Sequence, residues 1–148
     1  MRENNRWLGA SLVTLWIAVA LCALLGLLVM DVIDYRTSAT SLNQIIGADA
    51  AGLLLVAPAS VMVGVLVLLG RPGAPPLGLA PAVFAAYTYT QLIVGNEYLD
   101  RPGNVERFSP LLLGVFVLAS AVAIGAWTAS GREPLRVASG PADRVVRP

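Results

Sequence analysis

A polar segment at residues 96–110, NEYLDRPGNVERFSP, concentrates side chains capable of chemistry within an otherwise apolar chain. Its acids and arginines alternate, and an arginine guanidinium can hold a carboxylate through two parallel hydrogen bonds. Pro102-Gly103-Asn104 is typical of a turn. The segment predicts either a cap that pairs its own charges or a docking surface for a protein or ligand. Its candidate residues are Asn96, Glu97, Tyr98, Asp100, Arg101, Asn104, Glu106 and Arg107.

A second polar group, Asp31, Asp34 and Tyr35, follows the first long apolar run. The spacing of the two acids places both carboxylates on one helical face if the preceding helix continues. Two interpretations are open: a solvated helix end, or a cation site shared with the other acids at the same membrane face. Carboxylates at a helix C-terminus oppose the helix dipole and therefore need a counter-charge. The candidates for that charge are Arg36, Arg101 and Arg107.

Asp49 is a third candidate, and its chemistry depends on where its helix begins. If the helix starts near residue 50, the carboxylate caps free N–H groups in the first turn. If the helix starts nearer Leu42, Asp49 lies deeper, where an ionisable side chain costs about 2.5–3.5 kcal/mol on insertion scales. Asp49 is then a candidate proton or cation site.

Two further features belong to this intramembrane polar group. Tyr87, Gln91 and Tyr98 share one helical face, whereas Tyr89 points nearly opposite. A glutamine in hydrocarbon needs partners, so this face should turn inward, as polar contacts between helices or as the wall of a pocket. Pro58 removes one backbone hydrogen bond from its own helix. The freed carbonyl can be satisfied by a neighbouring helix or hydroxyl, or can line an ion path.

The elements that position these residues are four long apolar runs. Of the 148 residues 57% are hydrophobic and only 13% are charged, and crossing a bilayer core of about 30 Å takes roughly 20 helical residues. The runs predict an all-α integral membrane protein, an antiparallel bundle of four transmembrane helices in one domain over residues 1–131. The expected helices are 7–30, 50–70, 74–95 and 110–130, followed by a flexible basic cytoplasmic tail at 132–148.

The arginines predict the orientation of the bundle. All ten positive residues are arginine, which suggests a bacterial source. With four spans, both termini share one side, and that side carries seven arginines against three on the other. Because short cytoplasmic loops are enriched in positive charge, we expect both termini in the cytoplasm of a multi-pass protein of the cell inner (plasma) membrane. Residues 31–49 and 96–110 then lie on the extracytoplasmic face.

The composition excludes several classes of activity. The chain has no histidine and one cysteine, Cys22, which rules out histidine general-base catalysis, His-bearing metal sites and thiol exchange by paired cysteines. A net charge of +1 gives no electrostatic footprint for nucleic acid. We therefore predict no enzyme, no cofactor and no metal. A membrane enzyme using paired acids is the least favoured interpretation, because such catalysis needs placed groups that the sequence does not show.

The favoured function is a non-enzymatic accessory, interaction or ligand-binding subunit that acts through a structured extracytoplasmic face. Its expected partners are the lipid bilayer and either another protein or further copies of the same chain. The alternative is an oligomeric small transporter or channel, because four helices rarely enclose a pore. Its polar path would run along Asp49, Tyr87 and Gln91, beside the irregularity at Pro58.

Overall fold

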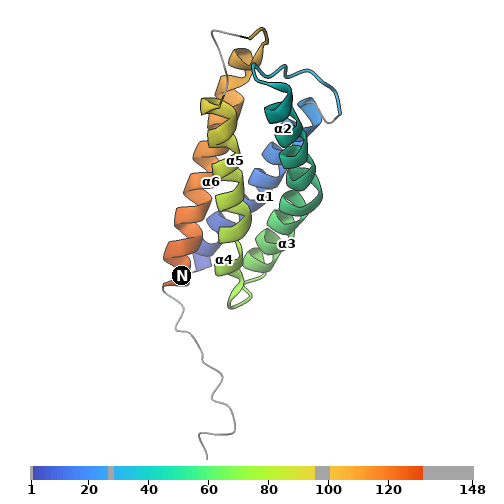
Figure 1. Cartoon of the computed structure of the whole chain (residues 1–148). Helices are drawn as coiled ribbons and strands as arrows, with labels where there is room; N and C mark the ends of the chain where they lie inside the picture. The colour runs from blue at the N-terminus through green and yellow to red at the C-terminus, as the bar shows by residue number, and fades with distance from the viewer. Residues whose placement is uncertain (1, 27–28, 96–100, 132–148) are drawn as a thin grey trace, which may run out of the picture.

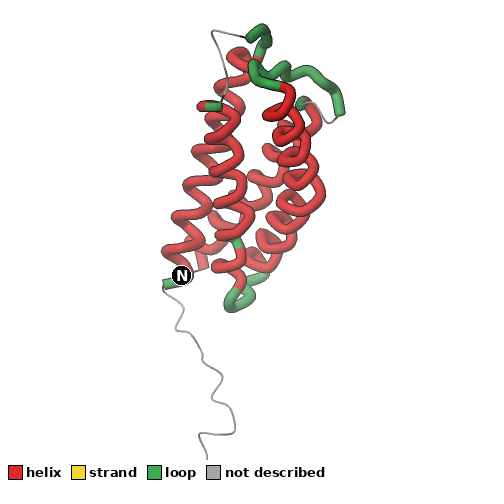
Figure 2. Tube along the Cα trace, in the orientation of Figure 1, coloured by secondary structure: helices red, strands yellow, loops and turns green. Residues whose placement is uncertain are grey.

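The computed structural model describes residues 2–26, 29–95 and 101–131, and over these residues the chain is an all-α bundle (Figure 1). The four candidate spans are Arg6–Leu25, Ala39–Leu68, Ala74–Val94 and Val105–Ser130, each long and apolar enough to cross a membrane. Successive spans run in opposite directions (Figures 1 and 2). The predicted fold class is therefore confirmed. The N-terminus lies at one end of the bundle, and the two long loops lie at the other.

Helix α1 (Arg2–Leu25) ends before the predicted residue 30. The amide of Gly26 still bonds to the Cys22 carbonyl at 2.8 Å, but the chain then turns back over the helix end. The amides of Val32 and Ile33 both donate to the Leu25 carbonyl at 3.0 Å. The last carbonyls of α1 are satisfied by this turn rather than by further helix.

Helix α2 (Ala39–Ala51) begins well before the predicted residue 50. Ser38 caps it by accepting a hydrogen bond from the Ser41 amide at 3.3 Å, which satisfies one of the free N–H groups of the first turn. Leu42 and Ile45 pack against the core. Asp49 therefore lies in the last turn of α2, and the prediction that it caps a first turn is wrong.

Pro58 shapes the next part of the same span. A π-helical turn, η1 (Gly52–Val56), separates α2 from α3 (Ala57–Leu68). Proline has no amide hydrogen and crowds the carbonyl four residues earlier. The helix before it therefore forms one wider, π-helical turn, in which the Ala57 amide donates to the Gly52 carbonyl five residues back. Pro58 itself is exposed on the outside of the bundle. Its side chain does not line an interior path within the described residues.

The third span is divided. After a left-handed turn at Gly73, with φ 79°, helix α4 (Ala74–Leu77) leads through Gly78 into α5 (Leu79–Val94). The predicted range 74–95 therefore holds a short helix and a long one. The last span begins with a 3₁₀ turn, η2 (Val105–Phe108), and continues as α6 (Ser109–Ser130). Pro110 occupies its first turn, close to the predicted start.

Helix α1 forms the centre of the packing, with α3 on one side and α6 on the other, and α5 packs against α6. Gly9 of α1 and Gly64 of α3 lie at a close contact between these two helices. A Cβ on Gly64 would lie 3.0 Å from the Gly9 carbonyl oxygen and 3.0 Å from Cγ2 of Val13. Small residues at such a contact let helix backbones meet in a membrane. Gly64 therefore packs against α1 within this chain.

Substituting Gly64 by alanine should weaken this contact. The added methyl meets a backbone oxygen that cannot move without shifting α1, so we expect a loss of about 1–3 kcal/mol in unfolding free energy relative to the control. The control is Gly114→Ala, because nothing lies within 4 Å of a Cβ there, and it gains the same helix propensity. Unfolding by SDS titration measures both. Equal stability of the two variants would contradict the close contact.

Candidate functional site

The two loops at one end of the bundle meet and bind each other. We call residues 29–38 and 101–108 together the two-loop face. Asn104 joins its halves: its Oδ1 accepts from the Asp34 amide at 2.9 Å, and its Nδ2 donates to the Val32 carbonyl at 3.0 Å. The Asn104 amide also donates to the Asp34 carbonyl at 3.0 Å. A single side chain therefore fixes the register of one loop on the other.

An ion pair adds a second connection. The Arg36 guanidinium donates to both carboxylate oxygens of Glu106, at 2.7 and 3.1 Å, and to the Arg101 carbonyl at 2.9 Å. The predicted arginine–carboxylate fork is present, but it crosses between the loops. The partner of Glu106 is Arg36, and no ion pair joins Glu106 to the adjacent Arg107 within the described residues.

Gly103 lies where the two loops touch. A Cβ at this position would be 2.7 Å from the Asp34 carbonyl oxygen and 2.7 Å from Cγ of Arg36. Only glycine permits this approach without moving backbone atoms. The turn residues predicted from Pro102-Gly103-Asn104 therefore make the contact between the loops.

Asp31 and Asp34 do not share a helical face, because α1 ends at Leu25 and the continuation of the helix on which that placement depended is not present. Both lie in the loop after α1, both are exposed, and Asp31 has a left-handed backbone with φ 51°. Tyr35 points inward and is only 3% exposed. Four other predicted residues, Asn96, Glu97, Tyr98 and Asp100, lie outside the described residues, as does the predicted tail at 132–148.

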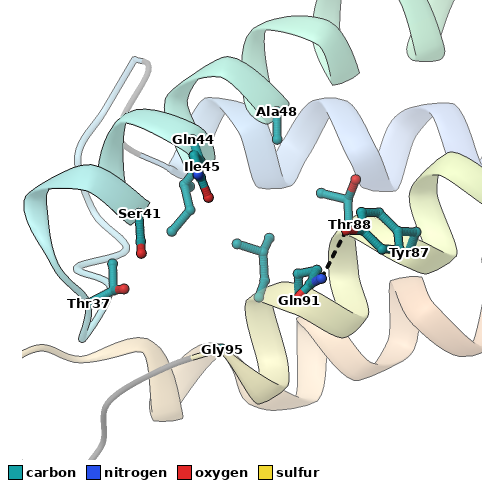
Figure 3. Close-up of a pocket in the computed structure, with 10 residues that line it drawn as sticks. Thr37, Ser41, Gln44, Ile45, Ala48, Tyr87, Thr88, Gln91 and Gly95 are labelled. Carbon is teal, nitrogen blue, oxygen red and sulfur yellow. Dashed lines mark hydrogen bonds between the residues drawn. The ribbon is translucent and has the colours of Figure 1, made fainter.

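Beside the two-loop face, α2 and α5 enclose an open cavity of about 290 Å³, which we call the α2–α5 hollow (Figure 3). One wall comprises Thr37, Ser41, Gln44, Ile45 and Ala48. The other comprises Tyr87, Thr88, Gln91, Leu92 and Gly95. The walls therefore present hydroxyl and amide groups among apolar side chains, and no lining residue is charged.

Tyr87 and Gln91 line this hollow, but they do not enter the core as predicted. Tyr87 is 64% exposed, and Gln91 donates from Nε2 to its hydroxyl at 3.0 Å (Figure 3). Of the two tyrosines in α5, Tyr89, which was expected on the opposite face, is the buried one, at 4% exposure. The prediction of a pocket wall fits the geometry, whereas the expected inward turn of this face is wrong. Tyr89 lies with Val19 and Ala23 of α1 in the lining of a small cavity instead.

Asp49 borders a second, much smaller cavity of about 10 Å³. Asp49 is 6% exposed, and its Oδ2 has no hydrogen-bond partner among the described residues. A Cβ on Gly26, just after α1, would lie 2.7 Å from that oxygen. The deeper of the two predicted placements of Asp49 is therefore the one in the structure, in the half of the bundle nearer the two-loop face.

Neutral groups surround this carboxyl. Cys22 of α1 and Tyr89 of α5 are buried beside it, within hydrogen-bonding reach of each other. Tyr35 approaches from the two-loop face, and burial raises the pKa of its phenol, which a negative charge on Asp49 would raise further. Tyr35 therefore stays uncharged at neutral pH.

None of the residues on the α2 wall of the hollow was predicted from the sequence as a site residue. Thr37, Ser41, Gln44 and Ala48 recur at spacings of four, three and four, the repeat of one helical face. That signal existed in the sequence. Because the second span was predicted to begin at residue 50, these residues fell in the loop before it.

Within the described residues no group of three or more His, Cys, Asp or Glu side chains gathers. Comparison with protein-family models, with curated proteins and with solved structures finds no match to this chain. The function must therefore be inferred from the geometry of its own residues.

Proposed function

We propose that this chain is a non-enzymatic, ligand-binding subunit of the membrane, and that its ligand is a neutral amphiphile held in the α2–α5 hollow. The observation that carries the proposal is the lining of that hollow. Gln44 and Gln91 each offer an amide donor and acceptor, Ser41 and Thr88 offer hydroxyls, and no lining residue is charged. A head bearing hydroxyl or amide groups would satisfy these side chains.

Position and size support an amphiphile. The hollow lies between two membrane-spanning helices, and the strong exposure of Tyr87 leaves its side open toward the surrounding lipid. Its volume of about 290 Å³ lies at the small end of ligand sites, which run from about 300 to 1,000 Å³. This space suits a headgroup and the start of an alkyl chain, with the rest of the chain in the bilayer.

The two-loop face has a supporting role in this proposal. Asn104 and the Arg36–Glu106 pair hold the loops that continue into α2 and α6, and Thr37 contributes to both the loop and the hollow. From the distribution of arginines, we propose that this face lies on the extracytoplasmic side of a bacterial plasma membrane. Docking of a protein partner there, and the oligomeric transporter, stay predictions.

A photoreactive monoacylglycerol tests the proposal, because its diol head is neutral and its acyl chain can carry a diazirine. We expect saturable labelling of the purified protein in phosphatidylcholine vesicles, mapped to α2 or α5 by mass spectrometry. Gln91→Leu should weaken apparent binding about tenfold, the effect of losing one hydrogen bond of about 1.4 kcal/mol. Gln44→Leu, on the facing wall, should act in the same direction.

The matched control is Thr90→Val, because Thr90 is exposed away from the hollow and its hydroxyl bonds to the Ala86 carbonyl. A fatty acid with the same chain and diazirine serves as the anionic probe and should compete poorly. Labelling that does not saturate, or that is equal in Gln91→Leu and Thr90→Val, would overturn the proposal.

A further inference from the structure

The carboxyl group of Asp49 has no part in the proposed amphiphile binding, and its burial among the described residues needs an explanation. Asp49 is only 6% exposed, and its Oδ2 has no hydrogen-bond partner among the described residues. A buried polar group without a partner is rare in folded proteins and calls for a physical explanation. An ionisable side chain within a membrane span marks a functional site by default.

The groups that face Asp49 from each neighbouring element are neutral. They are the Cys22 thiol from α1, the Tyr89 phenol from α5 and the Tyr35 phenol from the two-loop face. The end of α1 also lies against Oδ2 at Gly26, and the C-terminal end of a helix disfavours negative charge. Because none of these facing groups among the described residues is a cation, the carboxyl is most stable when it carries a proton.

A metal ion fits this site poorly. Divalent calcium takes six to eight oxygen ligands, several of them from carboxylates, and Asp49 is the one carboxylate among the residues lining its cavity. A cavity of about 10 Å³ has room for about one water molecule. The proton is the cation that a single carboxyl and one water can accommodate.

A route for that proton leads to the α2–α5 hollow. Ala48 and Thr88 line both the hollow and the small cavity, and both point into the space between the helices (Figure 3). One layer of side chains therefore separates the two spaces, and Thr88 carries a hydroxyl within that layer. The other residues of the small cavity include Val19, Gly52, Phe84 and Ala85, which offer no side-chain relay toward the opposite end.

We propose that Asp49 is a proton-binding site that exchanges with the α2–α5 hollow through the layer formed by Ala48 and Thr88. On release, the O–H bond of the carboxyl breaks, the proton passes to a water molecule in the hollow as hydronium, and a carboxylate stays behind. Uptake is the reverse. The site extends beyond the proposed amphiphile binding, because it requires the cavity wall but no amphiphile.

Infrared difference spectroscopy of the protein in lipid vesicles tests the protonation directly. We expect a carboxylic acid C=O band at neutral pH that is absent in Asp49→Asn and unchanged in Asp34→Asn, since Asp34 is exposed. Wild-type protein with ¹³C-labelled aspartate provides the same readout without any substitution: its acid band at neutral pH should shift with the label. Absence of an aspartic acid band at neutral pH would overturn the proposal.

Transfer into D₂O tests the route. Deuteration of the Asp49 carboxyl shifts its band, and we expect Thr88→Val to slow this shift about tenfold or more, equivalent to about 1.4 kcal/mol of added barrier. Thr90→Val is the matched control. Equal rates in the two variants would refute exchange through Thr88. These experiments contain no monoacylglycerol probe and do not measure its binding, so their failure is distinct from failure of the labelling experiment.

Discussion

Asp49→Leu should raise the unfolding free energy of this protein by about 1–3 kcal/mol, although it removes a polar residue from a candidate site. Leucine has nearly the same shape as aspartate, and it replaces a buried carboxyl oxygen that has no hydrogen-bond partner in the part of the chain that the structure describes. Leaving such a group unsatisfied costs about 1–3 kcal/mol, and the small cavity beside it can accept the slightly larger methyl groups. SDS titration of wild type and variant in the same detergent measures the difference.

Asp34→Leu serves as the control, because this aspartate is exposed in the loop after α1. A surface substitution of that kind should change stability by no more than about 0.5 kcal/mol. If Asp49→Leu were destabilising instead, the carboxyl would have a favourable partner that the described residues lack, and the uncompensated state inferred for it would be wrong.

Asn104→Ala should release the two loops from each other. It removes the acceptor for the Asp34 amide and the donor to the Val32 carbonyl, and unpaired groups of this kind cost about 1–3 kcal/mol where they are shielded from water. We therefore expect hydrogen–deuterium exchange at the Asp34 amide to become about ten- to a hundredfold faster, since each 1.4 kcal/mol corresponds to a factor of ten. Mass spectrometry with short peptides measures this exchange.

Arg107→Ala is the matched comparison, because Arg107 is exposed on the 3₁₀ turn that follows Asn104. Exchange at Asp34 should be unchanged in that variant. Exchange in the middle of α6 should be unaffected in both. Equal acceleration by both substitutions would mean that the loops respond to any change in η2, and that Asn104 has no special role in joining them.

The spans were predictable because an apolar run long enough to cross a bilayer is a signal that short polar interruptions rarely hide. The residues at which the spans begin were harder to predict. Asp49 and the polar residues before it made residues 39–49 resemble a loop, whereas Ser38 caps a helix there and Leu42 buries one of its faces. At α6, Ser109 and Pro110 gave a local signal, and its start was predicted to within one residue.

The partners within the site were beyond the reach of sequence spacing. Arg36 and Glu106 are separated by 70 positions, and alternating charges in residues 96–110 favoured neighbours over a distant loop. The burial of Tyr89 rather than Tyr87 depends on how α5 is rotated against α1 and α6, which helical periodicity alone does not determine. For Asp49, the sequence did predict a deep position on the condition that its helix began near Leu42, and α2 begins at Ala39.

The uneven spacing of the helices has a mechanical consequence. At Gly9 and Gly64 two backbones touch, so that contact is stiff, whereas α2 and α5 face each other across an open volume. We therefore expect lateral compression of the bilayer to deform the bundle first between α2 and α5. A ligand held in the α2–α5 hollow would oppose that deformation, so its residence time should depend on membrane tension.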